Sequence, residues 1–285
     1  MITPGEPTAS LVSALDRATV HSPPAGRVTA ICQDSRQVRP GAAFVAVPGS
    51  RLDGHAFLRH ARANGARLLV VQDDHRPIWE ELRYAGTGLV SVPDTRSALG
   101  RLAAAFHGYP ARDLTVVGVT GTDGKTTTCF LTAAVLAAGG LATATLSTVG
   151  TVIDGSLVPN QRNLTTPPVV EVQRFLADAR AAGAAAAVLE ASSHGLDQGR
   201  LAEADVDIAV LTTLTGDHLD YHGSRQAYLL AKAKLFEATG KAAVLDAGDP
   251  AAGALAARTS ARCVFYRTAP GGADLAADQI VQDGW

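Results

Sequence analysis

Cysteine, aromatic side chains and net charge are all scarce in this chain of 285 residues. The three cysteines, Cys32, Cys129 and Cys263, stand far apart and form no CxxC pair, which argues against a disulfide framework or a zinc site. A net charge of −2 gives no indication of a nucleic acid partner or an anionic membrane surface. Aromatic residues make up 5% of the chain against 28 glycines, a composition more typical of alternating strands and helices than of an aromatic-rich sandwich.

Long hydrophobic runs are scarce as well. The first residues, MITPGEPTASLVSAL, contain neither the basic region nor the apolar stretch of a secretory signal peptide. The most apolar run, residues 181–191, is interrupted by Gly183 and is too short to span a bilayer. We therefore expect a cytoplasmic protein with no membrane partner.

The hydrophobic pattern alternates between strands and helices and breaks at Pro110, which predicts two domains. Because the strands lack a clean polar alternation, we expect a mostly parallel sheet covered on both faces. The predicted fold class is α/β, with a small N-terminal domain at 1–110 and a phosphate-loop, ATPase-type central domain, incomplete, at 113–285. Strands are expected at 42–49, 67–72, 88–94, 114–120, 185–190, 206–214 and 241–249, and helices at 54–66, 95–108, 125–138, 167–183 and 228–236. A loop rich in Gly, Asn and Pro is expected after the helix at 125–138, and no further βα unit is evident after residue 262.

Residues 118–128, GVTGTDGKTTT, follow an apolar strand and open a helix, which is the context of a phosphate-binding loop. In such a loop, glycines let backbone N–H groups converge on phosphate oxygens, and the helix N-terminus adds partial positive charge. Lys125 would reach the β- and γ-phosphates, and Thr126 would hold Mg²⁺. The strict Walker pattern fails by one place, because Gly118 stands six positions before Gly124 rather than five. The alternative is a glycine-rich turn with a capping threonine.

With this loop in place, the chain resembles the Mur ligase family, and within it the MurE type. Five stretches carry the resemblance in the family's order: residues 34–57, the loop at 119–128, LTTP at 164–167, EASSHGLDQGR at 190–200, and DHLDYHGSRQAYLLAKAKLF at 217–236. The resemblance implies an ATP-dependent ligase of peptidoglycan synthesis. Such a ligase activates the carboxylate of UDP-MurNAc-L-Ala-D-Glu as an acyl phosphate, which an amino acid, meso-diaminopimelate or L-lysine, then attacks. ATP and Mg²⁺ are the implied cofactors.

The resemblance also implies roles for individual residues. Lys125, Lys232 and His218 would be catalytic, and Thr126, Glu190, His218 and Lys232 would bind metal. ATP would contact Gly121, Thr122, Asp123, Gly124, Lys125, Thr126 and Thr127, whereas the UDP-muramoyl peptide would contact Ser35, Thr165, Thr166, Ser192, Gln198 and Arg200.

Lys232 is unusual on physical grounds alone. At helical spacing its neighbours are apolar, among them Tyr228 and Phe236, and an unpaired ammonium on such a face is costly. Burial favours the neutral amine, which reacts with carbon dioxide to give a carbamate. In the MurE type the matching lysine is carbamylated and binds metal. The alternative is a lysine that keeps its charged end in water.

Simpler interpretations exist for the other site residues. Glu190 ends a strand, where a carboxylate is often solvated, and a lone histidine such as His218 is more often structural. The guanidinium of Arg200 suits phosphate or carboxylate, although most arginines are solvated at the surface.

The chain departs from the family pattern at several places. Asp123, Thr213, Gly216 and Asp246 replace residues that the family usually has around the nucleotide, and Gly248 stands in the same doubtful segment. The family's C-terminal Rossmann-like domain is also missing, so we expect no complete ligation unless a second chain supplies that domain. Two hypotheses of different class remain: a truncated ligase, and a non-catalytic relative that binds the UDP-muramoyl peptide or a nucleotide. A third hypothesis, a relative of folylpolyglutamate synthase, is disfavoured by the SSHGLDQGR and DHLDYHG stretches.

Overall fold

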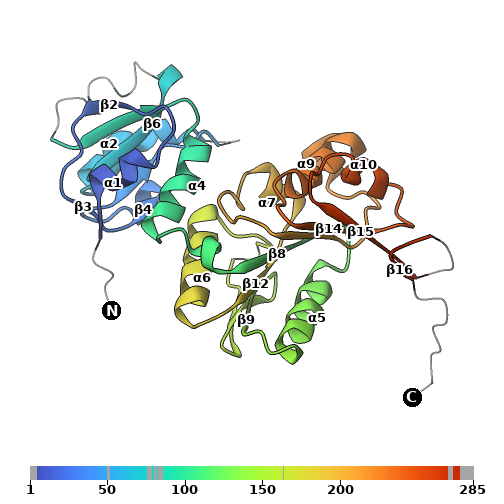
Figure 1. Cartoon of the computed structure of the whole chain (residues 1–285). Helices are drawn as coiled ribbons and strands as arrows, with labels where there is room; N and C mark the ends of the chain where they lie inside the picture. The colour runs from blue at the N-terminus through green and yellow to red at the C-terminus, as the bar shows by residue number, and fades with distance from the viewer. Residues whose placement is uncertain are drawn as a thin grey trace. The chain divides into compact units, whose positions relative to one another are not determined.

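The computed structural model describes residues 5–49, 52–75, 79, 82, 86–162, 164–268 and 272–276, and the chain separates into two compact units (Figure 1). One unit contains residues 1–109 together with 169–174, and the other contains residues 110–168 and 175–285. The division falls at Pro110, where the sequence pattern breaks. Each unit is built on its own main sheet.

The first unit contains a five-stranded sheet with the order β2-β7-β6-β5-β4, in which only β2 is antiparallel to its neighbour. The strands of this sheet are β2 (Thr19–Ser22), β4 (Ile31–Cys32), β5 (Ala43–Val45), β6 (Leu68–Gln72) and β7 (Gly88–Val92). Two further strands, β1 (Glu6–Pro7) and β3 (Arg27–Val28), pair with each other in a separate antiparallel sheet. Its helices are α1 (Thr8–Ser13), α2 (Leu58–Ala63) and α4 (Thr95–Phe106), with short 3₁₀ turns η1 (Ser35–Gln37), η2 (Gly54–Phe57) and η3 (Asp73–His75). Asp94 begins α4 by accepting a hydrogen bond from the N–H of Arg96.

The second unit is built on a nine-stranded sheet with the order β11-β10-β9-β12-β8-β13-β14-β15-β16. The pairs from β9 to β16 are parallel, and only β10 and β11 run antiparallel to their neighbours. The strands are β8 (Thr115–Thr120), β9 (Thr143–Leu146), β10 (Gly150–Ile153), β11 (Ser156–Pro159), β12 (Ala186–Glu190), β13 (Ile208–Leu211), β14 (Ala242–Asp246), β15 (Arg262–Arg267) and β16 (Leu275–Ala276). The predicted α/β class with a mostly parallel sheet is therefore confirmed.

Helices lie on both sides of this sheet, with α5 on one side and α9 and α10 on the other (Figure 1). The helices are α5 (Lys125–Ala138), α6 (Val169–Ala181), of which residues 175–181 belong to this unit, α7 (Ser193–Asp197), α8 (Leu219–His222), α9 (Arg225–Glu237) and α10 (Ala252–Ala256). The 3₁₀ turn η5 (Pro110–Asp113) leads into β8. Gly118 lies inside β8, and a side chain there would come within 2.8 Å of Leu235 in α9. Glycine is therefore needed at this position for the close packing of α9 on the sheet, not for the turn of the loop that follows β8.

Two segments differ from the sequence-based expectation. The region after α5, expected to be a loop, contains β9 and the β10–β11 hairpin, which extend the sheet at one edge. At the other edge α10 is followed by β15, so the alternation of helices and strands continues past residue 262. The last residues of the expected central domain, 277–285, lie outside the described residues.

Within the described part of the chain, no helix is long and apolar enough to cross a bilayer. All three cysteines are free, with Cys32 and Cys129 buried.

Candidate nucleotide and substrate site

Three neighbouring strands of the second unit end at one edge of its sheet and bring Glu190 to the loop at 121–124. β12, β8 and β13 are adjacent and parallel, with Glu190 beside Val119 and Leu211 beside Thr120. The residues after β8 form the loop at 121–124, β12 ends with Glu190, and the segment after β13 leads to His218. Ligands of parallel sheets bind at this carboxyl edge.

The loop at 121–124 is held against the segment that follows β13. Thr122 donates its N–H to the carbonyl oxygen of Thr213 at 2.6 Å, and the Thr212 hydroxyl donates to the carbonyl oxygen of Asp123 at 2.6 Å. A Cβ at Gly121 would lie 1.8 Å from the Thr212 Oγ1, so only glycine fits there. Gly124 has a left-handed backbone, φ 79°, and precedes the first residue of α5.

Lys125 and Thr126 begin α5 and point back towards this edge. The Lys125 amine donates to the carbonyl oxygens of Gly121 and Thr122 at 3.1 and 2.8 Å. The first N–H groups of a helix have no partner within it and bind anions well. The arrangement suits a phosphate chain, and the predicted strand, loop and helix occur in the expected order.

Glu190 is not a solvated strand-end carboxylate, since only 2% of it is exposed. Its two oxygens accept hydrogen bonds from the Thr126 hydroxyl, both at 3.0 Å, and from the N–H and hydroxyl of Thr148 at 2.8 and 3.2 Å. Carboxylate and hydroxyl oxygens are the protein ligands that Mg²⁺ prefers. The donor set therefore fits the metal that the sequence predicts. Thr148 was not predicted, because it lies in the segment expected to be a loop.

Lys232 is buried, with 1% of the residue exposed, so the alternative of an amine kept in water is wrong. Its Nζ donates to the carbonyl oxygen of Gly121 at 2.7 Å and to the Thr120 hydroxyl at 3.4 Å, and lies 4.7 Å from the centre of the Tyr228 ring. No carboxylate among the described residues forms an ion pair with it. Burial, assisted by the nearby charge of Lys125, lowers the pKa of the Lys232 amine to about 7.

His218 lies after β13 with a left-handed backbone, φ 52°, and its side chain is half exposed. Its ring packs edge-on against that of His194, 4.8 Å between centres, in a group of rings that includes Tyr221 and His222. No hydrogen bond connects it to Glu190 or Lys232 among the described residues. Its metal-binding role therefore stays a prediction.

Five of the six residues predicted for the UDP-muramoyl peptide, all but Ser35, are joined by hydrogen bonds beside Glu190. Thr166 donates its hydroxyl to the Glu190 carbonyl oxygen at 2.7 Å and accepts the N–H of Ser192 at 2.9 Å. The Ser192 hydroxyl caps α7, and the Thr165 hydroxyl oxygen lies 3.0 Å from that of Thr148. Arg200 donates to the Thr166 carbonyl oxygen at 2.5 Å and, through Nε and Nη2, to the Gln198 side chain at 3.1 and 2.7 Å.

Ser35 lies in the first unit, where its hydroxyl is 3.0 Å from Nδ1 of His60 and its carbonyl oxygen accepts from the Asn64 side chain. Its neighbours line a shallow cavity of about 470 Å³ formed by Arg36, Val38, Arg39, Pro40, His60 and Asn64.

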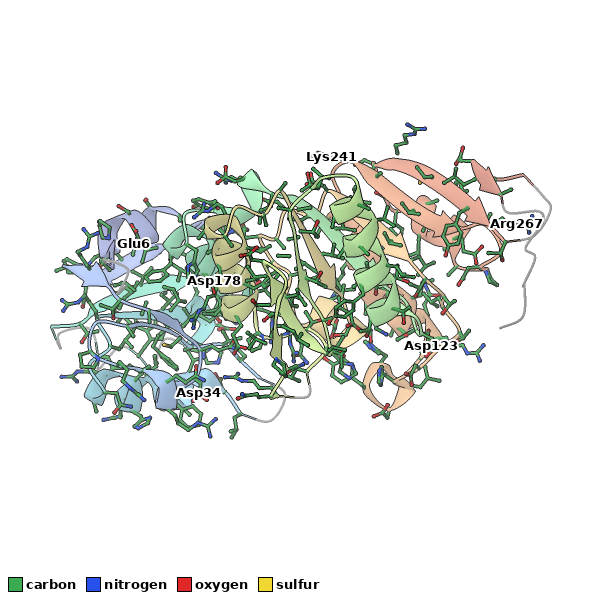
Figure 2. All side chains as sticks on the ribbon, turned by 90° about the horizontal axis from the view of Figure 1, so that it is seen from below. Glu6, Asp34, Asp123, Asp178, Lys241 and Arg267 are labelled. Carbon is green, nitrogen blue, oxygen red and sulfur yellow. The ribbon has the colours of Figure 1, made fainter. Side chains whose placement is uncertain are left out.

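The residues that depart from the family pattern lie in loops or at a strand end. Thr213 supplies the carbonyl oxygen that holds Thr122, and Asp123 is exposed (labelled in Figure 2). Gly216 has a positive φ of 99°, which favours glycine. Asp246 accepts the N–H of Gly248 at 2.8 Å.

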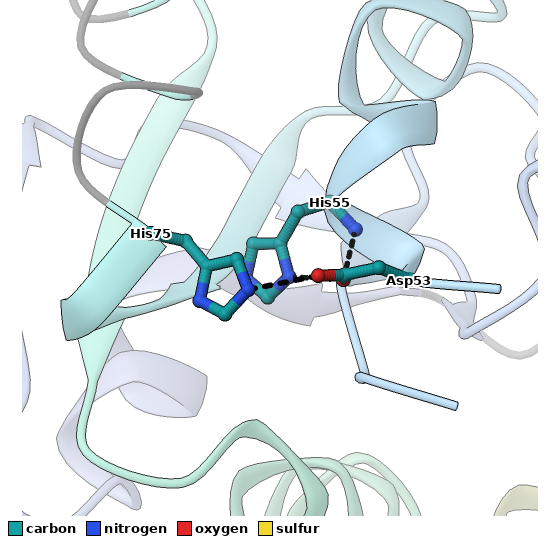
Figure 3. Close-up of side chains that lie close together, drawn as sticks. All are labelled: Asp53, His55 and His75. Atoms are coloured by element: carbon teal, nitrogen blue, oxygen red, sulfur yellow. Dashed lines mark hydrogen bonds and ion pairs between the residues drawn. The ribbon is translucent and has the colours of Figure 1, made fainter. Parts of the chain in front are cut away.

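One cluster that the sequence did not single out lies in the first unit. Asp53, His55 and His75 have ligand atoms within 4.8 Å of one another, an arrangement that could hold a metal (Figure 3). However, Nε2 of His55 accepts the N–H of Gln72 at 2.9 Å, so Nδ1 carries the proton and donates it to Asp53 at 2.6 Å. A metal at Nδ1 would require an imidazolate. The hydrogen bonds therefore argue against a metal in this cluster.

Comparison with known proteins agrees with the geometry. The model of the Mur ligase middle domain matches residues 119–284, and that of the Mur ligase family catalytic domain matches residues 27–107. A UDP-N-acetylmuramyl-tripeptide synthetase from Roseiflexus sp. is 42% identical over 245 residues, which are 81% of this chain and 47% of that protein. A UDP-N-acetylmuramoyl-L-alanyl-D-glutamate–2,6-diaminopimelate ligase from Xanthomonas campestris is 43% identical over 78% of this chain and 44% of its own length.

Solved structures give the same result. A UDP-N-acetylmuramoyl-L-alanyl-D-glutamate–2,6-diaminopimelate ligase superposes with a TM-score of 0.72 at 31% identity, covering 88% of this chain and 50% of that one. MurF from Acinetobacter baumannii superposes with a TM-score of 0.64 at 25% identity, covering 93% and 54%. The chain thus spans about half the length of the relatives it matches. Since the middle-domain model alone matches more than half of its residues, the chain belongs to the Mur ligase family.

Proposed function

We propose that this chain supplies the nucleotide site and the UDP-muramoyl-peptide site of a MurE-type ligase. The reaction transfers the γ-phosphoryl group of ATP to the D-Glu side-chain carboxylate of UDP-MurNAc-L-Ala-D-Glu. An amino acid, meso-diaminopimelate or L-lysine, then attacks the acyl phosphate to form an amide bond. The names of the relatives support this substrate.

The observation that carries the proposal is the contact between Thr126 and Glu190 directly beneath the loop at 121–124. It places a buried carboxylate, a hydroxyl and a helix N-terminus at one edge of the sheet, with the Lys125 amine folded over the same loop. Anionic reactants repel one another, and fixed cations and N–H dipoles offset that repulsion. Mg²⁺ held by Thr126 and Glu190 would supply further positive charge.

Lys232 and His218 complete the proposed metal-binding set. Because the Lys232 amine is unpaired and has a pKa of about 7, a large fraction of it is neutral near pH 7 and able to form a carbamate. A carbamate would replace the amine's hydrogen bond to Gly121 with a carboxylate-like group. His218 would bind the metal through a nitrogen of its half-exposed ring.

Arg200 would bind an anionic group of the UDP-muramoyl peptide. Its guanidinium is fixed by Gln198 and by the Thr166 carbonyl oxygen, which orients the fork and lowers the entropy lost on binding. Thr165, Thr166 and Ser192 would contribute hydroxyls beside it. In the first unit, Ser35 and the adjoining cavity would take the uridine end. We propose that the amino-acid substrate binds to a part of the protein that the relatives have beyond the matched residues. This part would lie on the same polypeptide or on a second chain.

Titration calorimetry tests the proposal. ATP with Mg²⁺ and UDP-MurNAc-L-Ala-D-Glu are each titrated into the chain and into Lys125→Ala. We expect both ligands to bind the unchanged chain, and the variant to lose at least about tenfold in ATP affinity while the UDP-muramoyl peptide binds as before. Saturable binding of the UDP-muramoyl peptide with no binding of ATP would overturn the nucleotide half of the proposal and indicate a substrate-binding relative.

A further inference from the structure

Tyr228 of α9 is a buried tyrosine whose hydroxyl reaches the loop at 121–124. Only 1% of the residue is exposed, and its hydroxyl oxygen lies 3.1 Å from the Thr122 Oγ1. The two residues are 106 positions apart in the sequence. None of the roles assigned above uses this contact.

The hydroxyl of Tyr228 has a specific purpose, because a phenylalanine would fill the same space without a polar group. Burying a hydroxyl is unfavourable unless it forms a hydrogen bond, and here the Thr122 side chain provides it. The Thr122 oxygen also accepts the N–H of Thr215 at 3.1 Å. This oxygen therefore joins three segments: the loop, the residues after β13, and α9.

Thr122 stands at the place where the loop most needs support. Gly121 on one side and Gly124 on the other give the backbone unusual freedom, and both have positive φ. The Thr122 N–H is held from one direction by the Thr213 carbonyl oxygen at 2.6 Å, and the side chain is held from another by Tyr228. A shift at this residue would also move the Gly121 and Thr122 carbonyl oxygens that orient the Lys125 amine.

We propose that Tyr228 is a positioning residue for the nucleotide phosphates, with its hydroxyl holding Thr122 so that the loop keeps its binding shape. The inference rests on the proposed nucleotide site and adds to it a residue outside the loop. Tyr228 touches no phosphate itself. It acts through Thr122, so its effect disappears when the Thr122 hydroxyl is removed.

A double-mutant cycle tests this dependence. Tyr228→Phe, Thr122→Val and the double variant are compared with the unchanged chain in titrations with ATP and Mg²⁺. We expect each single variant to bind ATP about three- to tenfold more weakly, the range for loss of one hydrogen bond. The double variant should bind within about twofold of the weaker single variant, because the two changes remove the same contact.

Thr239→Val is the matched control. The Thr239 hydroxyl is also buried and bonds the Leu235 carbonyl oxygen of α9, but it does not reach the loop. We expect this variant to lower the thermal midpoint about as much as Tyr228→Phe does while ATP affinity stays unchanged.

Three results would overturn the inference. One is an unchanged ATP affinity in Tyr228→Phe, and another is a double variant whose loss equals the product of the two single losses. The third is an equal loss of affinity in Thr239→Val, which would mean that the tyrosine acts only through general stability. If the unchanged chain binds no ATP, the proposed nucleotide site is refuted, and the role of Tyr228 is refuted with it. If the unchanged chain binds ATP and one of the three results is found, only the role of Tyr228 is refuted.

Discussion

Lys125 and Lys232 donate hydrogen bonds to the same carbonyl oxygen, that of Gly121, at 3.1 and 2.7 Å. Two ammonium groups on one acceptor repel each other, and the buried one bears the larger cost. Burial is the larger cause of the fall of the pKa of the Lys232 amine to about 7, and this repulsion adds to it. The loop at 121–124 and α9 thus meet at an amine, that of Lys232, whose proton is bound more weakly than that of an ordinary lysine.

Replacement of Lys232 by methionine is expected to stabilise the nucleotide-free chain. The change removes a buried amine that has no carboxylate partner among the described residues and keeps a side chain of similar length, so the free energy of unfolding at pH 7 should rise by about 1–3 kcal/mol. Urea denaturation measures it. Lys234→Met, on an exposed lysine of the same helix that pairs with Asp197, should change stability by less than about 1 kcal/mol. A destabilised Lys232→Met chain would show that the amine is better satisfied than its contacts indicate.

Glu190→Gln should remove the benefit of Mg²⁺ for ATP binding. The amide keeps one acceptor oxygen but loses the charge that would bind the metal, so ATP affinity in the presence of Mg²⁺ should fall about tenfold. Affinity measured in EDTA should stay equal or rise, because a negative charge near the phosphates is gone. Asp154→Asn, in the exposed turn of the β10–β11 hairpin, is the control. An unchanged difference between Mg²⁺ and EDTA in Glu190→Gln would remove Glu190 from the metal site.

Arg200→Lys should weaken binding of UDP-MurNAc-L-Ala-D-Glu about tenfold and leave ATP binding as it is. Lysine keeps the charge but cannot reproduce the fork that Gln198 and Thr166 orient. Isothermal titration of both ligands provides the comparison. Arg258→Lys, on an arginine paired with Glu237, serves as the control and should alter neither affinity. Equal weakening of both ligands in Arg200→Lys would point to a loss of folding instead.

His75 is expected to give the chain a pH-dependent component of stability. Its two ring nitrogens contact Asp53 at 2.8 Å and Asp74 at 2.6 Å, and these hydrogen bonds raise its pKa despite the opposing effect of burial. A raised pKa in the folded state means that the stabilisation is complete below the unfolded value of about 6.5 and is lost as the pH rises through the folded value.

His75→Gln should therefore cost about 1 kcal/mol near pH 6 and much less near pH 8.5, measured by urea denaturation at each pH. The neighbouring His55 has a lowered pKa, chiefly because it is buried. Its protonation in acid should therefore destabilise the unchanged chain and His75→Gln alike. Asp74→Asn should also reduce the pH-dependent part of the stability that His75 contributes. A constant difference between the chain and His75→Gln from pH 6 to pH 8.5 would contradict the assignment.

Much of the site could be predicted because its signals are local in the sequence. The loop, the helix that starts at Lys125 and the apolar neighbours of Lys232 are all patterns of fewer than twenty residues, and the helix at 125–138 has the predicted bounds. Neighbouring strand ends then bring Glu190 to the loop, as parallel sheets require. The strand Ala186–Glu190 likewise follows from a continuous apolar run.

The contacts that were missed depend on residues distant in sequence or on weak patterns. Nothing near Tyr228 indicates that it reaches Thr122. The β10–β11 hairpin is poorly patterned because β11 is exposed along its length, although Asp154-Gly155 is a known hairpin turn signal and both residues have positive φ. Thr148 was missed with it, since its contact to Glu190 depends on where β9 ends.

The hydrogen bonds between Thr122 and Thr213 and between Asp123 and Thr212 join protein groups alone. A loop whose conformation is already fixed by such hydrogen bonds loses little conformational entropy when an anion binds. The affinity then depends mainly on the contacts between the loop and the anion. Preorganisation of this kind also means that the chain, by itself, should show nearly the same amide-exchange protection at residues 121–124 before and after a nucleotide enters.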